Sequence, residues 1–85
     1  MKSARVMWWG RMGEARMHSE FESHRIPFRP KICGWFPNHD DELDICEGQF
    51  WGTATFRAGD AGKAVDVALR AGAERVEVRP SEDEV

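Results

Sequence analysis

An acidic segment holds the densest group of side chains that could do chemistry. It contains four carboxylates and one imidazole: Asp40, Asp41, Glu42, Asp44 and His39. An EF-hand calcium loop is excluded, because its sixth position requires glycine and its twelfth glutamate, where this chain has Ile45 and Trp51. A divalent-metal site, mimicry of nucleic-acid phosphate or docking on a basic partner, and a solvated loop all stay open. We assign the four carboxylates to a partner-binding surface.

The cysteines and histidines do not have the spacing of a zinc site. Structural zinc sites bring ligands in close pairs such as C-x2-C, whereas Cys33, His39 and Cys46 follow one another at six and seven residues. His18 and His24 lie further upstream. We therefore predict no metal site and no cofactor. Free thiols are favoured over a Cys33–Cys46 disulfide, which stays open, because no secretion signal accompanies them.

The chain lacks the sequence motifs that anchor enzyme reactions. It contains no G-x-S-x-G, no P-loop and no G-x-G-x-x-G. The residues for a Cys–His nucleophilic pair, or for acid–base chemistry by His39 with a carboxylate, are present. Most chains with a few cysteines and histidines contain such residues, so their presence does not indicate catalysis. We predict that the protein is not an enzyme.

Aromatic residues are numerous for a chain of 85 residues. Most fall in or beside predicted strands: Trp8, Trp9, Trp35, Trp51, Phe28, Phe36, Phe50 and Phe56. One helix covers one face of a sheet, so aromatics on both faces leave some exposed or covered by a partner, although core packing competes as an explanation. We assign Trp8, Trp9, Trp35 and Phe36 to the partner-binding surface.

The segment from Thr53 to Arg79 predicts a strand, a helix and a strand. Apolar residues recur at three- and four-residue steps, which is typical of a helix with one buried side: Ala61, Ala64, Val65, Ala68 and Leu69. Asp60 is expected to cap its start and Gly72 its end. Alternation in 50–57 and 75–79 predicts a strand on each side, and a third strand could lie between these two.

The remaining segments predict an α+β fold with a small, largely antiparallel sheet. Residues 4–9 are expected to form a strand with apolar side chains on both faces, and the alternation of 14–22 predicts a second strand that forms a hairpin with it. Residues 26–31 are expected to be irregular because of their prolines, and 32–36 to form a short strand. The predicted order is ββ(β)βαβ, with one main helix packed on one face. Residues 1–80 form a single domain, and 81–85 a disordered acidic tail.

Charge is divided unevenly along the chain, whose net charge is −3. Residues 1–31 carry a balance of +4, residues 32–56 one of −5, and residues 57–85 one of −2. No apolar run approaches the roughly 20 residues that span a bilayer, so we expect a cytoplasmic protein without membrane contact.

Two functional hypotheses follow from these patterns. The first is a protein-binding module that engages another protein, or a second copy of itself, through an aromatic sheet face and the acidic loop. The strand–helix–strand segment and the small size resemble the general format of phage-encoded and accessory inhibitors, anti-CRISPR proteins among them, which block a larger partner. The alternative is single-stranded nucleic-acid binding, with bases stacked between tryptophans and arginines; the acidic balance and the lack of an RNP-like motif weigh against it.

Overall fold

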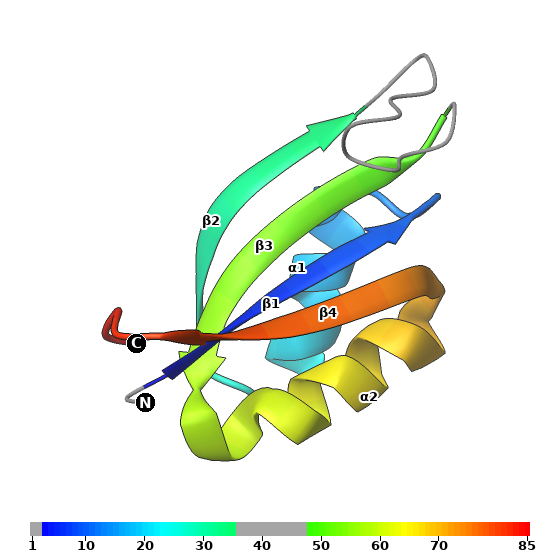
Figure 1. The fold of residues 1–85 in the computed structure, drawn as a ribbon. Helices are drawn as coiled ribbons and strands as arrows, with labels where there is room; N and C mark the ends of the chain where they lie inside the picture. The colour runs from blue at the N-terminus through cyan, green and yellow to red at the C-terminus, as the bar shows by residue number, and fades with distance from the viewer. Residues whose placement is uncertain (1–2, 36–47) are drawn as a thin grey trace.

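A computed structural model describes residues 3–35 and 48–85. It contains four strands and two α-helices in the order β1, α1, β2, β3, α2, β4 (Figure 1). Their bounds are Ser3–Gly10, Glu14–Ser23, Phe28–Trp35, Phe50–Arg57, Ala61–Ala71 and Ala73–Ser81. No helix among these residues has the length and apolar character needed to cross a membrane.

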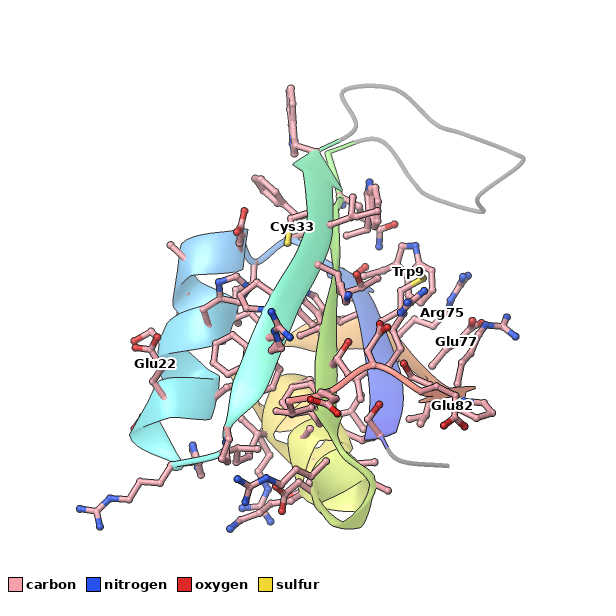
Figure 2. The ribbon with its side chains drawn as sticks, turned by 90° about the vertical axis from the view of Figure 1, so that its left-hand side faces the viewer. Trp9, Glu22, Cys33, Arg75, Glu77 and Glu82 are labelled. Atoms are coloured by element: carbon pink, nitrogen blue, oxygen red, sulfur yellow. The ribbon has the colours of Figure 1, made fainter. Side chains whose placement is uncertain are left out.

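The four strands form one antiparallel sheet in the order β2-β3-β1-β4. The two helices pack on each other and on the same face of the sheet, and Figure 2 shows α1 on one side of the sheet with the C-terminal segment on the other. This is the split βαβ, or ferredoxin-like, arrangement. It confirms the predicted α+β class, and β1 is the strand that lies between β3 and β4.

The prediction of a strand over residues 14–22 was wrong, because this segment forms α1. Met17 and Phe21 are its buried residues, and a spacing of four places two side chains on the same side of either a strand or a helix. No β-branched residue lies between Glu14 and Glu22. The two buried residues fit the strand period and the helical period equally well, so the helix propensity of the residues between them decides that this segment is a helix. The predicted hairpin does not form.

Helix α2 and its flanking strands confirm the predicted strand–helix–strand segment. Gly72 ends the helix in the left-handed region, with φ of +117°. Asp60 occupies the N-cap position of the helix, as predicted, at the end of a 3-10 turn, Ala58–Asp60. Its side chain makes no capping hydrogen bond, so that part of the prediction was wrong. The buried side is also rotated from the predicted one, because Val67 is buried while Leu69 is 49% exposed.

The core lies between the helices and the sheet. Its largest side chains are aromatic, and Phe21 packs edge-on against Trp8 and Phe56 with ring centroids 5.5 and 4.9 Å apart. The Trp8 ring lies over Gly52, its partner on β3. A Cβ at Gly52 would come within 2.6 Å of the Trp8 ring. The absence of a side chain at this position is what allows the indole to pack this close to β3.

Candidate functional site: the helix-free face of the sheet

The sheet face opposite the two helices, called the helix-free face below, carries a groove. It has a volume of about 310 Å³. Its lining comes from the three strands β1, β2 and β3: Arg5, Met7, Trp9, Lys31, Ile32, Trp51 and Thr53. These side chains form an apolar floor with two cations beside it.

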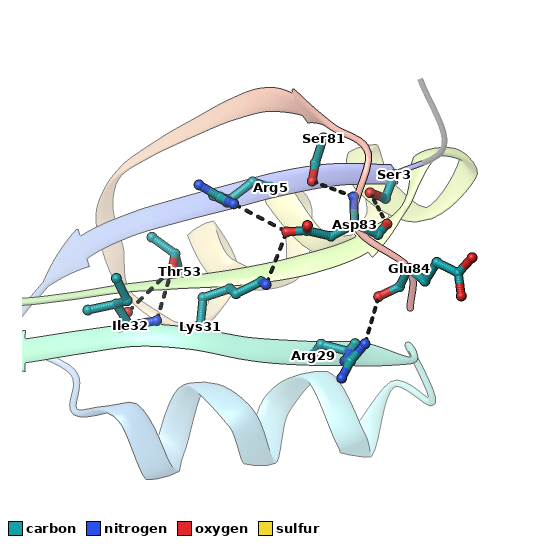
Figure 3. A network of polar contacts seen from close by, with 9 residues as sticks. All are labelled: Ser3, Arg5, Arg29, Lys31, Ile32, Thr53, Ser81, Asp83 and Glu84. Carbon is teal, nitrogen blue, oxygen red and sulfur yellow. Dashed lines mark hydrogen bonds and ion pairs between the residues drawn. The ribbon is translucent and has the colours of Figure 1, made fainter.

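A bulge in β2 supplies two neighbouring side chains to this groove. The register of β2 against β3 shifts between Pro30 and Cys33. Consecutive side chains of a regular strand point to opposite faces, whereas Lys31 and Ile32 both line the groove. Thr53 holds the bulge in place, because its Oγ1 accepts from the Ile32 N–H at 3.2 Å and donates to the Ile32 carbonyl at 3.5 Å (Figure 3).

The two tryptophans of the groove are direct cross-strand partners, Trp9 on β1 and Trp51 on β3. The Arg75 guanidinium of β4 lies 3.9 Å from the centroid of the Trp9 ring, in cation–π geometry. Trp9 is consequently only 5% exposed although no helix covers it. The Trp51 ring packs over Gly34, where a Cβ would come within 2.6 Å of the indole nitrogen.

The cationic end of the groove holds a carboxylate from the C-terminal segment (Figure 3). Asp83 pairs with Lys31 at 3.0 Å and with Arg5 at 3.2 Å. Hydrogen bonding and charge from Lys31 and then Arg5 lower the pKa of this carboxyl below its usual value. The Ser3 hydroxyl donates to the Asp83 carbonyl at 2.6 Å, and Arg29 donates to the Glu84 carbonyl at 3.4 Å.

Residues 81–85 were expected to form a disordered tail, and that expectation about their motion stays a prediction. Ser81 is the last residue of β4. Its hydroxyl accepts from the Asp83 N–H at 3.1 Å, which turns the chain back over the sheet. The segment therefore crosses the helix-free face and joins β1 to β2 through Asp83.

The predicted partner-binding residues occupy separate places. Trp8 is 1% exposed in the core, where its indole has no surface to offer a partner. Trp9 lies on the helix-free face beneath Arg75. Trp35 is 54% exposed at the end of β2, beside Phe50. The other five lie outside the described residues: Phe36, Asp40, Asp41, Glu42 and Asp44.

A second group of polar side chains lies on the opposite, helix-bearing side of the sheet. Glu14, His18 and Cys33 place one ligand-type atom each within 4.8 Å of the others. Cys33 is a free cysteine, as favoured from the sequence. Burial, followed by the charge of the nearby Glu14 carboxylate, raises the pKa of this thiol, so it carries its proton at neutral pH.

The cationic end of the groove was missed by sequence reasoning. Arg5, Lys31 and Asp83 are far apart in the chain, and only the strand order β2-β3-β1 together with the return of the tail brings them together. One signal was present: Arg5 alternates with apolar neighbours in β1, which puts it on the same face as Met7 and Trp9.

No model of a known protein family matches this chain, and a search of curated proteins finds no significant relative.

Proposed function

We propose that this protein is a non-enzymatic protein-binding module. Its helix-free face would take a segment of a partner protein in which apolar side chains stand next to a carboxylate. The observation that carries the proposal is the position of Asp83, whose carboxylate lies between Arg5 and Lys31 at the edge of an apolar groove.

Charge complementarity supports a carboxylate-bearing partner. Arg5 and Lys31 stand on strands β1 and β2, with β3 between them, so a single carboxylate can bridge them. Charge-assisted hydrogen bonds of this kind are about twice as strong as neutral ones. A partner carboxylate would replace that of Asp83, which makes the tail an internal competitor for the site.

The floor of the groove supports an apolar neighbour for that carboxylate. Ile32 is 62% exposed, and it lines the groove together with Met7 and Trp51. Exposed apolar surface rimmed by charge is typical of protein-binding sites.

Several finer parts of the proposal come from the sequence alone. The acidic residues 40–44 are proposed as a second contact, suited to a basic patch on the partner. We also propose that the module acts in the cytoplasm as an inhibitor of a larger partner, in the manner of phage-encoded or accessory proteins. A second copy of the chain is the competing partner.

Selection from a library of linear peptides tests the proposal directly. We expect enriched peptides to carry Asp, Glu or a terminal carboxylate beside large apolar residues. Calorimetry with one such peptide should show weaker binding to Arg5→Gln and Lys31→Gln, by about 1.5–3 kcal/mol each for a lost charged hydrogen bond. Asp83→Asn should bind more tightly, since it removes the competitor.

The control is Arg70→Gln, which removes an equally positive side chain from α2, where Arg70 pairs with Asp66 at 3.2 Å and with no other acidic side chain in the described part of the chain. It should bind like the native protein. Equal weakening by all three charge variants would contradict a specific site. Light scattering on the native protein gives its mass, and a dimer that dissociates in Lys31→Gln would identify a second copy as the partner.

Single-stranded nucleic acid is the alternative ligand, favoured by the Trp9–Trp51 pair on the open face of a four-stranded sheet, the format in which RNA-recognition domains stack bases. The 5% exposure of Trp9 under Arg75 leaves little ring area for a base. Binding of labelled oligonucleotides that weakens steeply with salt would establish this alternative in place of the peptide site.

A further inference from the structure

Three side chains with metal-binding atoms meet between α1 and the sheet. Glu14 is the first residue of α1, and His18 follows it one turn later. The His18 Nδ1 lies 3.8 Å from a Glu14 carboxylate oxygen. Cys33 of β2 completes the group, and the three ligand-type atoms lie within 4.8 Å of one another.

The fold positions these residues by two local devices. A spacing of four places Glu14 and His18 on one side of the helix. The bulge in β2 returns Cys33 to the helix-bearing face, where it stands opposite Gly52. The missing side chain at Gly52 makes room for the sulfur, since a Cβ there would lie 2.9 Å from the Cys33 Sγ.

We propose that Glu14, His18 and Cys33 form a three-ligand site for a divalent transition metal, with zinc as the best-suited ion. Carboxylate oxygen, imidazole nitrogen and thiolate sulfur are all zinc ligands, with bonds of about 2.0–2.3 Å. Ligand atoms around a tetrahedral zinc of that size stand roughly 3.3–3.8 Å apart. Small side-chain rotations bring a group that already lies within 4.8 Å to this geometry.

The ligand set also matches the ion in charge. A carboxylate and a thiolate contribute two negative charges, which a divalent cation neutralises. The thiol proton passes to solvent when the Cys33 Sγ–metal bond forms. Among the described residues, the ion pairs of Glu14 involve His18 alone, so no lysine or arginine competes there for its carboxylate.

Contacts with two aromatic rings fix the position of the His18 imidazole. The His18 ring meets Trp8 edge-on at 6.2 Å between centroids and lies tilted against Phe28 at 5.1 Å. Its side chain is 16% exposed. The His18 Nε2 is buried and has no hydrogen-bond partner among the described residues. A bound ion would give this buried ring a strong polar partner through one of its nitrogens.

A fourth coordination position faces a hollow of about 230 Å³ that Glu14 and Cys33 line together with Trp35 and Phe50. Zinc sites with three protein ligands keep one position open for water or another ligand. The competing account is a metal-free contact, in which the Cys33 thiol donates to the Glu14 carboxylate. Metal titration separates the two accounts.

Cobalt titration of the purified protein provides the direct test, because a Co²⁺–thiolate bond gives a charge-transfer absorption band. We expect a band that saturates at one equivalent of Co²⁺ and disappears when Zn²⁺ is added. Zinc should also raise the midpoint of thermal unfolding, since an ion that binds only the folded state stabilises it.

The variants assign the ligands. Cys33→Ser should abolish the band, and Glu14→Gln and His18→Gln should abolish saturation at one equivalent. Circular dichroism checks that each variant folds. If His18→Gln does not fold, Glu14→Gln still tests the ligand assignment, because Glu14 lies in an exposed first turn of α1. The matched controls are Cys46→Ser and His24→Gln, which should keep both the band and its stoichiometry.

Several results would overturn the proposal. The first is no charge-transfer band in the native protein, and the second is a band that survives in Cys33→Ser. The third is a band that saturates unchanged in Glu14→Gln, or that is lost in either control variant. Zinc-induced stabilisation that persists in folded Cys33→Ser would count against the site in the same way.

Discussion

Thr53 and Thr55 stand on the same face of β3, and both are buried, yet their hydroxyls have different surroundings. The Thr53 Oγ1 bonds to both the N–H and the carbonyl of Ile32 in the bulge. The Thr55 Oγ1 is buried without a hydrogen-bond partner among the described residues. A buried hydroxyl with no partner costs free energy, whereas a bonded one contributes it.

Substitution by valine should therefore destabilise the protein at position 53 but not at position 55. Thr53→Val should lower the free energy of unfolding by about 1–2 kcal/mol, because it leaves the Ile32 N–H without its acceptor. Thr55→Val should leave this free energy unchanged or raise it by up to about 1 kcal/mol. Urea unfolding of the two variants measures both values. A larger loss in Thr55→Val than in Thr53→Val would contradict these assignments.

Large aromatic rings pack on both faces of the sheet, and each of two tryptophans lies over a glycine of the neighbouring strand. Trp8 lies over Gly52 on the helix-bearing face, and Trp51 lies over Gly34 on the other. Each pair consists of direct cross-strand partners. Glycines inside strands often mark such close approach.

Gly52→Ala should consequently destabilise the protein, by about 1–3 kcal/mol for an overpacked core. The added methyl would meet the Trp8 ring at 2.6 Å and the Cys33 sulfur at 2.9 Å. The control is Gly62→Ala in α2, where a Cβ meets nothing within 4 Å. That change should stabilise by about 0.4–1 kcal/mol. Thermal unfolding compares the two, and similar midpoints would show that Trp8 can move aside.

Among the helices and strands, the ones that could be predicted from the sequence are those whose apolar residues fit either the helical or the strand period, but not both. The alternation of 50–57 fits only a strand and the apolar spacing of α2 fits only a helix, and both elements were predicted, although the buried side of α2 was not. Met17 and Phe21 fit a strand and a helix equally, so α1 was predicted as a strand. The groove was harder still, because a register shift puts Lys31 and Ile32 on one face. Residue types do not encode that shift.

The C-terminal segment contacts strands β1 and β2, which lie far from it in the sequence. Ser3 at the start of β1 and Arg29 on β2 both donate to carbonyls of residues 83 and 84. Asp83 adds its ion pairs to Arg5 and Lys31. The tail thus links the edge strand β2 to the central strand β1 across the helix-free face, at the cationic end of the groove proposed to receive a partner. Release of the tail and binding of a carboxylate-bearing partner are therefore expected to be coupled.

Acidity should release this attachment in a defined window. The folded pKa of Asp83 is lowered by Lys31 and Arg5, so its ion pairs stabilise the closed tail above the usual aspartate pKa of about 3.9. That contribution is lost as the pH falls through the lower folded pKa of Asp83.

The ¹³C shift of the Asp83 carboxyl should titrate with a midpoint below about 3.9. In the Lys31→Gln, Arg5→Gln double variant the midpoint should return toward that value, while Arg70→Gln should leave it lowered. A midpoint that the double variant does not move would mean that the two cations do not hold the tail, and the groove would then be open to a partner at neutral pH without competition from Asp83.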